Sequence, residues 1–268
     1  MKFKNCAIAY NFDNSEHKTI CTKLLEEISA FGLRCDVINI NSLKHDYDLV
    51  FVMGGDGTIL KAARFYSGSE TVIFGINIGR LGFLSQTSKE NFSNAFQKIF
   101  NGEYKIEKRI MLEANGYNAL NDFVIKSKEY GRTSRFSVKI DGKEVCTYVA
   151  DGVIISTPTG STAYCLSAGG PVITPNIEAF VIVPVCAHTL TARPLVIPSD
   201  SVISVSQTDS KSSKTCVLSV DGQGNYEFKD EITIKKSSRK TNLLILDDLN
   251  FYTILQTKLN WGTTPNYC

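Results

Sequence analysis

Short apolar runs separated by amphipathic or polar stretches characterise the N-terminal third of the chain. The runs span 6–10, 35–40, 49–53 and 71–78. They are rich in bulky and β-branched residues, which is typical of strands buried on both faces of a parallel sheet. The pattern therefore predicts several parallel strands in this part of the chain.

An amphipathic segment lies between the first two runs. Asn14 or Ser15 is a candidate N-cap, and Gly32 is a candidate stop. The apolar residues of this segment recur at helical spacing: Ile20, Leu24, Leu25, Ile28 and Phe31. Further helices are expected at 58–65 and 88–100. The strand–helix–strand order predicts a Rossmann-like α/β domain over residues 1–100.

Strand-like runs dominate from residue 101 onwards. They include 111–114, 122–127, 136–140, 144–149, 153–157, 202–207, 216–220 and 231–235. Asp141-Gly142, between two of these runs, is a strong signal for a two-residue hairpin. We therefore expect a second, β-rich and sandwich-like domain over 101–242, followed by a strand at 243–246 and a helix at 251–259.

Composition sets limits on the function. The chain has 268 residues, 43% apolar and 21% charged, with a net charge of +2, which suits an ordinary globular protein of two domains. No dense basic block is present, so nucleic-acid binding is not expected. The apolar run near Met1 is too short for a secretory signal, and no run is long enough to span a membrane. Eight cysteines without a C-x-x-C pair indicate free thiols and a cytoplasmic location.

A glycine-rich turn, Gly54-Gly55-Asp56-Gly57-Thr58, follows the apolar run 49–53. A predicted helix begins next to it, and a helix N-terminus favours an anion such as phosphate. A carboxylate beside phosphate needs a divalent cation between them, or else serves as a proton acceptor. The turn thus predicts a phosphoryl-transfer site, whereas the simpler interpretation is a tight strand-to-helix turn.

Candidate ligand-binding residues, each with a simpler structural explanation, lie in four further stretches: 75–84, 121–122, 151–164 and 221–223. Asn77, in 75–84, supports the Asp56 turn or meets phosphate. The pair Asn121-Asp122 and the dipeptide Asp151-Gly152 are also typical of turns. In 159–164, Ser161 or Thr162 is a candidate helix N-cap that leaves hydroxyl and N–H groups free for a nucleotide. Asp221-Gly222-Gln223 is also compatible with a plain hairpin.

Taken together, the order and spacing of these five stretches resemble the NAD kinase family, in its bacterial form, along essentially the whole chain. The glycine turn alone is shared more loosely with phosphofructokinases and diacylglycerol kinases. The resemblance implies an ATP- and Mg²⁺-dependent enzyme that phosphorylates the 2′-hydroxyl of the adenosine ribose of NAD. It also implies that 243–268 packs back onto the first domain, and that the protein is a homo-oligomer, a tetramer in which a neighbour completes the NAD site.

The resemblance also implies roles for individual residues. Asp56 is the expected catalytic residue, and Gly55, Gly57 and Thr58 are expected to bind the ATP phosphates. The expected NAD-binding residues are Asn121, Asp122, Asp151, Thr159, Thr162, Ala163, Tyr164 and Ser167. Possible cleft-lining residues are Asn77, His188, Asp221 and Gln223. One departure is Ala187, where the family has a proline before His188.

Two other functions remain as alternatives. A lipid or sugar kinase of the same superfamily would share the glycine turn, but the nucleotide-binding stretch 159–164 argues against it. A non-catalytic NAD(P)-binding sensor would keep the fold without turnover, and the intact Asp56 turn argues against that. A dehydrogenase is not supported, because no G-x-G-x-x-G follows a predicted strand.

Overall fold

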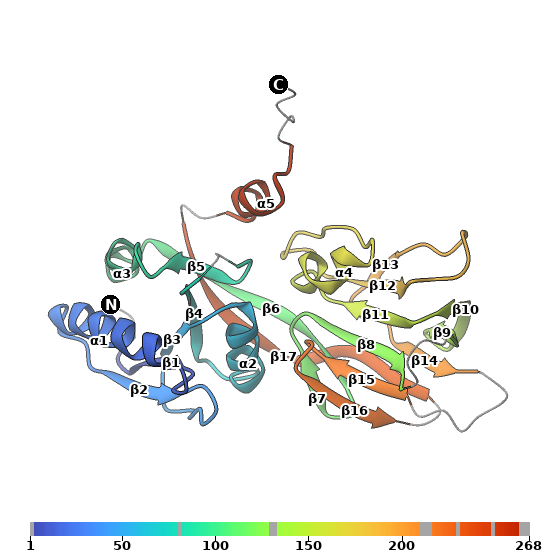
Figure 1. Ribbon diagram of the computed structural model, residues 1–268, viewed down its shortest axis with the longest axis horizontal. Coiled ribbons are helices and arrows are strands. Elements are labelled where there is room, and N and C mark those ends of the chain that lie inside the picture. Colours follow the sequence, from blue (N-terminus) through green and yellow to red (C-terminus); the bar gives the residue numbers. More distant parts are fainter. Residues whose placement is uncertain are drawn as a thin grey trace. The chain divides into compact units, whose positions relative to one another are not determined.

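The computed structural model describes residues 3–79, 82–128, 133–208, 216–228, 231–247 and 250–262. The chain forms two compact units (Figure 1). Unit 1 comprises Met1–Lys108 and Thr241–Cys268, and unit 2 comprises Arg109–Lys240. Among the described helices, none has the length and apolar character needed to cross a membrane.

Unit 1 is built on a parallel sheet with the strand order β17-β4-β3-β1-β2, and β5 also pairs with β4. The strands are β1 (Cys6–Tyr10), β2 (Cys35–Asn39), β3 (Leu49–Met53), β4 (Val72–Asn77), β5 (Ser85–Ser88) and the end of β17 (Glu231–Leu246). Every residue of β1, β3 and β4 is buried, as the near-continuous apolar runs predict.

The described helices of unit 1 are α1 (Ser15–Ala30), α2 (Asp56–Phe65), α3 (Phe92–Asn101) and α5 (Phe251–Leu259). Helices α1 and α3 pack with Phe51 and Phe74 of the sheet in one core cluster, and Ile59 of α2 contacts Gly75. The N-cap of α1 is Asn14, whose Oδ1 accepts hydrogen bonds from two backbone N–H groups. Helix α3 begins at Phe92 rather than at 88, because 85–88 pairs with β4 as a strand that the apolar pattern does not reveal.

Unit 2 contains two antiparallel sheets. One has the order β13-β12-β11-β8-β15-β16, and the other has the order β10-β9-β14-β17. The first contains β8 (Asp122–Ser127), β11 (Gly152–Ser156), β12 (Ala179–Val185), β13 (Leu195–Pro198), β15 (Cys216–Val220) and β16 (Gly224–Phe228). The second contains β9 (Ser134–Ile140), β10 (Lys143–Ala150) and β14 (Ile203–Gln207) together with β17.

The core of unit 2 lies between these sheets. Phe123 and Phe180 come from the first sheet, and Phe136 and Ile232 from the second. The hairpin predicted at Asp141-Gly142 connects β9 and β10, and both of its residues have a positive φ. Strands β6 (Tyr104–Ala114) and β7 (Tyr117–Ala119) pair with each other. An α/β N-terminal part and a sandwich-like β-rich part are thereby confirmed.

Three strand ends of unit 2 meet at one edge. Antiparallel pairing places Asp122, at the start of β8, opposite Ser156 at the end of β11. It also places Phe123 opposite Val220, at the end of β15. The residues just beyond these ends therefore come from three distant parts of the sequence and lie next to one another. Three of the predicted site residues, Asn121, Asp122 and Asp221, lie at the ends of β8 and β15 that meet here.

Candidate functional site

The glycine turn of unit 1 presents Asp56 at the carboxyl edge of the parallel sheet. Strand β3 ends at Met53, and Asp56 is the first residue of α2, two residues before the predicted start of this helix. Its Oδ2 accepts a hydrogen bond from Phe83 N at 2.8 Å, and its Oδ1 accepts one from Leu84 N at 3.2 Å. The half-buried carboxylate thus has a defined orientation before any substrate binds.

Gly82 is required for this arrangement. A Cβ at position 82 would overlap the carboxylate of Asp56, so any side chain there would displace the acid. The Gly82 N–H donates to Ser85 Oγ at 2.9 Å, which fixes the backbone at this close approach. Gly82 was not among the predicted site residues. Its position in the glycine-rich stretch 75–84 is the sequence feature that could have indicated its role.

Asn77 organises the loop that contacts Asp56. This side chain, 1% exposed, accepts a hydrogen bond from Gly79 N at 2.6 Å and lies 3.5 Å from Ser85 Oγ. Ser85 Oγ in turn receives the Gly82 N–H. These contacts correspond to the first of the two roles expected for Asn77, support of the Asp56 turn.

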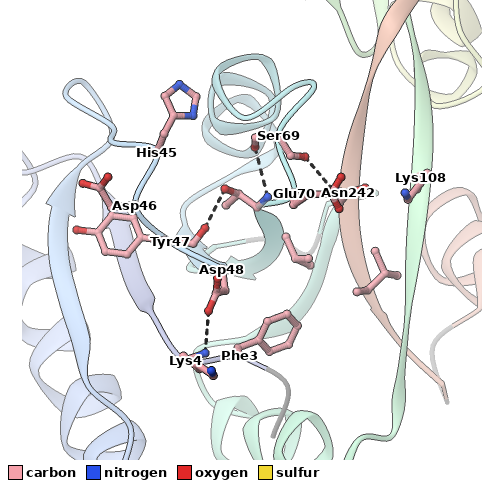
Figure 2. A pocket seen from close by; sticks show the side chains of 13 residues that line it. Phe3, Lys4, His45, Asp46, Tyr47, Asp48, Ser69, Glu70, Lys108 and Asn242 are labelled. Atoms are coloured by element: carbon pink, nitrogen blue, oxygen red, sulfur yellow. Dashed lines mark hydrogen bonds between the residues drawn. The ribbon is translucent and has the colours of Figure 1, made fainter.

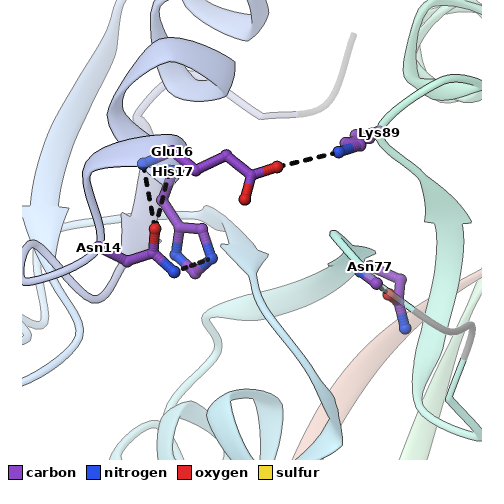
Figure 3. A network of polar contacts seen from close by, with 6 residues as sticks. Asn14, Glu16, His17, Asn77 and Lys89 are labelled. Atoms are coloured by element: carbon purple, nitrogen blue, oxygen red, sulfur yellow. Dashed lines mark hydrogen bonds and ion pairs between the residues drawn. The ribbon is translucent and has the colours of Figure 1, made fainter.

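The same edge of the sheet holds the first turn of α1, shown with Asn77 in Figure 3. Glu16 pairs with Lys89 at 3.2 Å, which links α1 to the residue that follows β5. His17 Nε2 lies 3.0 Å from Asn14 Nδ2, and burial lowers the pKa of this histidine. The half-exposed ion pair contributes little to stability, because solvent screens it. We assign these residues a structural role.

In unit 2, a buried aspartate binds the turn that contains Asn121 and Asp122. Asp221 Oδ1 accepts hydrogen bonds from Asn121 N at 2.7 Å and Asp122 N at 3.2 Å, and its Oδ2 accepts one from Leu120 N at 3.2 Å. The backbone of Asp221 donates to Asp122 O at 3.0 Å. Asp221 itself has a positive φ of 49°, a conformation that aspartate tolerates better than most residues.

The carbonyl groups of this turn are bound from the opposite side. Thr157 N donates to Asn121 O at 2.9 Å, and Thr157 Oγ1 donates to Leu120 O. Gly160 packs directly on the turn, because a Cβ there would overlap Asn121 O. Thr157 and Gly160 were not among the predicted site residues, although both lie in or beside the stretch 159–164. The turn is therefore fixed on both sides.

A cavity of about 560 Å³ lies on the face of the first sheet of unit 2 that carries Asp122, Val124 and Lys126. Its lining includes six of the predicted site residues: Asn121, Asp122, Asp151, Ala163, Tyr164 and Asp221. Lys126, Cys186, Ser219 and Asn225 also line it and were missed, because strand residues that alternate with buried ones carry no distinctive sequence signal. The volume is adequate for part of a dinucleotide.

The stretch 159–164 differs locally from the expectation. Gly160–Thr162 forms one turn of 3₁₀-helix, and α4 (Tyr164–Ser167) follows with Ala163 as its N-cap and no side-chain cap bond. The prediction that Ser161 or Thr162 caps a helix is therefore wrong. Ser161 Oγ is buried and bonds Pro158 O, Ile173 O and Ile173 N, so a local hydrogen-bond network uses this hydroxyl instead.

Burial dominates the electrostatics of the cavity. Burial, followed by the charge of Asp221, raises the pKa of Asp122 to about 7. Burial also raises the pKa of Tyr164, with smaller contributions from Cys186, Asp151 and Asp122. The ring of Tyr164 is 46% exposed and offers a face for stacking. The cavity thus combines an aromatic surface with closely spaced carboxylates.

Several predicted residues lie outside the cavity lining. Thr159 Oγ1 lies 3.3 Å from Nη1 of Arg109, and Thr162 Oγ1 donates to Thr159 O at 3.3 Å. His188 is exposed, and its N–H donates to Val149 O. The two remaining residues, Ser167 and Gln223, are exposed as well.

A different cavity, of about 840 Å³, lies at the amino ends of β1, β3 and β4 in unit 1 (Figure 2). Lys4, Asp48 and Glu70 are among the charged residues that line it. Some of the polar groups drawn there are hydrogen-bonded to one another, as in the contact of Lys4 N with Asp48 Oδ2 at 2.8 Å. None of the predicted site residues lines this cavity. It lies at the opposite edge of the sheet from Asp56.

Two family models match the chain. The model of the ATP-NAD kinase N-terminal domain matches residues 10–104, and that of the ATP-NAD kinase C-terminal domain matches residues 120–246. A NAD kinase of Thermoanaerobacter sp. is 42% identical over 223 residues, which cover 79% of this chain and 78% of that protein.

Solved structures resemble the chain over nearly its full length. The crystal structure of an NAD kinase from Archaeoglobus fulgidus in complex with ATP has a TM-score of 0.82 and 27% identity, covering 96% of this chain and 98% of that one. The structure of yeast NADH kinase complexed with NADH has a TM-score of 0.83 and 23% identity, covering 99% of this chain and 90% of that one. The second likeness concerns the fold alone.

Proposed function

Because the chain belongs to the NAD kinase family, it forms NADP and ADP from NAD and ATP, and we propose that its two units divide this reaction. The acceptor is the 2′-hydroxyl of the adenosine ribose. Unit 2 binds NAD in the cavity beside Asp122, and unit 1 supplies Asp56 for the phosphoryl transfer. The observation that carries this division is that predicted NAD-binding residues line one cavity while Asp56 has its own oriented turn.

Asp56 accepts the proton of the 2′-hydroxyl. A carboxylate has about four lone-pair positions, and the N–H groups of Phe83 and Leu84 use two of them. The other lone-pair positions can accept a hydrogen bond from a substrate hydroxyl. Because the acid is already oriented, little reorganisation is needed when the oxygen attacks the γ-phosphorus and its proton moves to Asp56.

The N-terminus of α2 binds the ATP phosphates. Gly55 and Gly57 are exposed at this end, Thr58 is half-buried, and Gly55 has no side chain to cap the helix. The partial positive charge of a helix N-terminus stabilises a phosphate there. The backbone of the glycines and the hydroxyl of Thr58 therefore supply the contacts.

The cavity of unit 2 binds the adenosine part of NAD. Asn121 and Asp122 face the ribose hydroxyls, and Tyr164 offers a ring face on the same cavity. The backbone of Ala163 bonds the adenine edge, and Asp151 contacts the nicotinamide-ribose side. Thr159, Thr162 and Ser167 lie outside the lining, so the family resemblance is their support. The same holds for His188 and Gln223.

Magnesium is required for the transfer. Within the described residues, no three His, Cys, Asp or Glu side chains form a metal-binding group. Mg²⁺ commonly uses only one or two carboxylates and completes its shell with phosphate oxygens and water. An ion that arrives bound to the ATP phosphates therefore needs few ligands from the protein. When bound, the ion neutralises charge on the phosphates.

The protein is a homo-oligomer, a tetramer, in the cytoplasm. Support comes from exposed apolar side chains of unit 2: Leu190, in the segment between β12 and β13, is 94% exposed, and Val196, on the edge strand β13, is 49% exposed. Association with a second copy would bury such side chains. The described cysteines have free thiols, as a reducing compartment favours.

Incubation of the purified protein with NAD, ATP and Mg²⁺ tests the activity, with NADP measured by an NADP-specific dehydrogenase. We expect NADP to form in proportion to enzyme and to depend on Mg²⁺. Controls without ATP and with Asp56→Asn should give almost none. NAD binding without NADP formation would instead favour a non-catalytic sensor, and phosphorylation of a lipid or sugar would favour another kinase of the superfamily.

A further inference from the structure

Asp221 holds a fixed negative charge beside the turn that carries Asp122. Its carboxylate accepts the N–H groups of three successive residues, 120, 121 and 122. Hydrogen bonds from backbone N–H groups stabilise a carboxylate in its ionised form. The side chain of Asp221 is 7% exposed, so little solvent screens its charge from its neighbours.

Asp122 differs from Asp221 in the hydrogen bonding of its carboxylate. It is 4% exposed and lines the cavity, and within the described residues its carboxylate makes no hydrogen bond. A buried carboxylate without donors is costly, and a second carboxylate beside it increases the cost. The arrangement is stable when Asp122 holds a proton, or when a ligand supplies hydroxyl donors.

We propose that Asp221 is a positioning residue of the NAD site, which fixes the 120–122 turn and, through its charge, couples NAD binding at Asp122 to the release of one proton. This inference rests on the proposed function, because it takes the cavity as the binding site of the adenosine ribose. The proton leaves Asp122 for solvent, and two ribose hydroxyls then donate to the ionised carboxylate. Asp221 acts through the hydrogen bonds that fix the turn and through its charge beside Asp122.

The groups around Asp122 set the direction of this coupling. Asp221 faces it from the end of β15, Tyr164 and Cys165 from α4, and Asp151 and Lys126 from the cavity wall. Burial, followed by the charge of Asp221, raises the pKa of Asp122 to about 7. Below this pH the free protein holds the proton, and binding must release it. NAD affinity should therefore rise with pH, by about tenfold between pH 6 and pH 8.

Isothermal titration with NAD from pH 6 to pH 8.5, in two buffers of different ionisation enthalpy, measures both affinity and the number of protons released. For the wild type we expect the rise in affinity and the release of a proton below pH 7. Asp122→Asn should bind NAD more weakly and with no pH dependence in this range. A wild-type affinity that is flat from pH 6 to pH 8.5 would overturn the inference.

Two substitutions at position 221 separate charge from positioning. Asp221→Asn keeps the shape and removes the charge, so the midpoint of the affinity profile should move to lower pH by about one unit or more. Asp221→Glu keeps the charge, so the midpoint should stay near that of the wild type even if the turn is displaced and the affinity falls. An equal loss of affinity at every pH in Asp221→Asn, with the midpoint unmoved, would show a merely structural role and overturn the inference.

Asp141→Asn is the matched control. Asp141 also has a positive φ, of 51°, and its Oδ1 accepts a backbone N–H, from Val202 at 2.8 Å, but it lies in the β9–β10 hairpin and does not line the cavity. Its affinity profile should match the wild type. If Asp122→Asn binds NAD as the wild type does while NADP still forms, the assignment of the cavity in the proposed function fails. Loss of binding in Asp122→Asn with an unmoved Asp221→Asn profile defeats this inference alone.

Discussion

At the residue scale, the aspartates of the proposed site differ in how their carboxylates are satisfied. Asp56 receives two backbone N–H groups and Asp221 receives three, whereas the carboxylate of Asp122 receives none from the described residues. The first two are oriented by the fold. Asp122 is held in an unfavourable environment, which is typical of binding and catalytic groups. The chemistry of the site therefore depends on which acids the backbone has already bound.

The substitution Asp122→Asn should stabilise the protein increasingly as the pH rises. The pKa of Asp122 is raised in the folded state to about 7 from its ordinary value of 3.8, so the folded state binds more protons than the unfolded state between these values. The free energy of unfolding of the wild type therefore falls as pH rises through this window, and the penalty is complete above about pH 7. The variant lacks this titration.

Thermal unfolding at pH 5 and pH 8 measures the effect. The difference in Tm between variant and wild type should be more positive at pH 8, by roughly 2–10 °C, for a linked free energy of about 1–3 kcal/mol. Asp141→Asn should show no such trend. A Tm difference that is the same at both pH values would mean that the acid is not destabilised in the folded protein.

At the element scale, two glycines let loops approach acids and turns more closely than a side chain would allow. Gly82 meets the carboxylate of Asp56, and Gly160 meets the backbone of Asn121. The first contact involves the end of a side chain, which can rotate away. The second involves a carbonyl group, which can move only with its turn. Substitutions at the two positions should therefore have different consequences.

We expect Gly82→Ala to lower kcat for NADP formation by about 10²-fold, because the displaced carboxylate no longer meets the attacking hydroxyl. The Kd for NAD should change little. Gly160→Ala should instead raise the Kd for NAD by about tenfold or more, since the Asn121–Asp122 turn must shift. Steady-state kinetics and isothermal titration on both variants provide the comparison. Equal effects on kcat and Kd in both would contradict the separate roles given to the two loops.

The sequence predicts best those strands whose apolar residues coincide with the buried positions of the structure. Strands β1, β3, β8 and β15 have the predicted bounds, because their apolar runs coincide with their buried residues. Helix α5 also has the predicted bounds, with Asn250 as its N-cap. Strand β5, Ser-Gln-Thr-Ser, was missed because polar residues buried at a sheet edge look like a loop. Strand β17 was read as two runs, since Ser237 to Lys240 interrupt its apolar pattern.

The site was predictable in part. The sequence motifs identified Asp56, Asn121 and Asp122 as candidate site residues. They did not reveal that Asp221 binds the 120–122 turn, because this contact joins residues about a hundred positions apart in the sequence. The supporting groups Gly82 and Thr157 act through backbone contacts, which side-chain chemistry does not reveal. The helix cap expected at Ser161 failed because its hydroxyl is used by Pro158 and Ile173.

At the scale of the whole molecule, two strands run through both units. The boundaries at 108/109 and 240/241 fall inside β6 and β17, so no change in composition marks them. Each unit has its own cluster of buried apolar residues, and unit 1 combines the first 108 residues of the chain with the last 28. The proposed division of binding and transfer therefore follows the division of the fold.

The exposed apolar side chains of unit 2 predict how copies associate. Sedimentation at low micromolar concentration should show a tetramer, and Leu190→Glu combined with Val196→Lys should dissociate it, because charges cannot be buried against a second copy. Surface substitutions at Lys18 and Lys23, both exposed on α1, serve as controls and should leave the assembly intact. A wild-type monomer with full activity would contradict the oligomer.

The kinetics of Asp56→Asn are the most direct test of whether Asp56 accepts the proton of the 2′-hydroxyl. Asparagine keeps the size and one acceptor oxygen but cannot take a proton at neutral pH. We expect kcat for NADP formation to fall by about 10²- to 10⁴-fold, while the Kd for NAD stays nearly unchanged, because the proton is taken only as the transition state forms. Excess Mg²⁺ should not restore the rate. Near wild-type turnover, or recovery with added Mg²⁺, would contradict the role of Asp56 as proton acceptor.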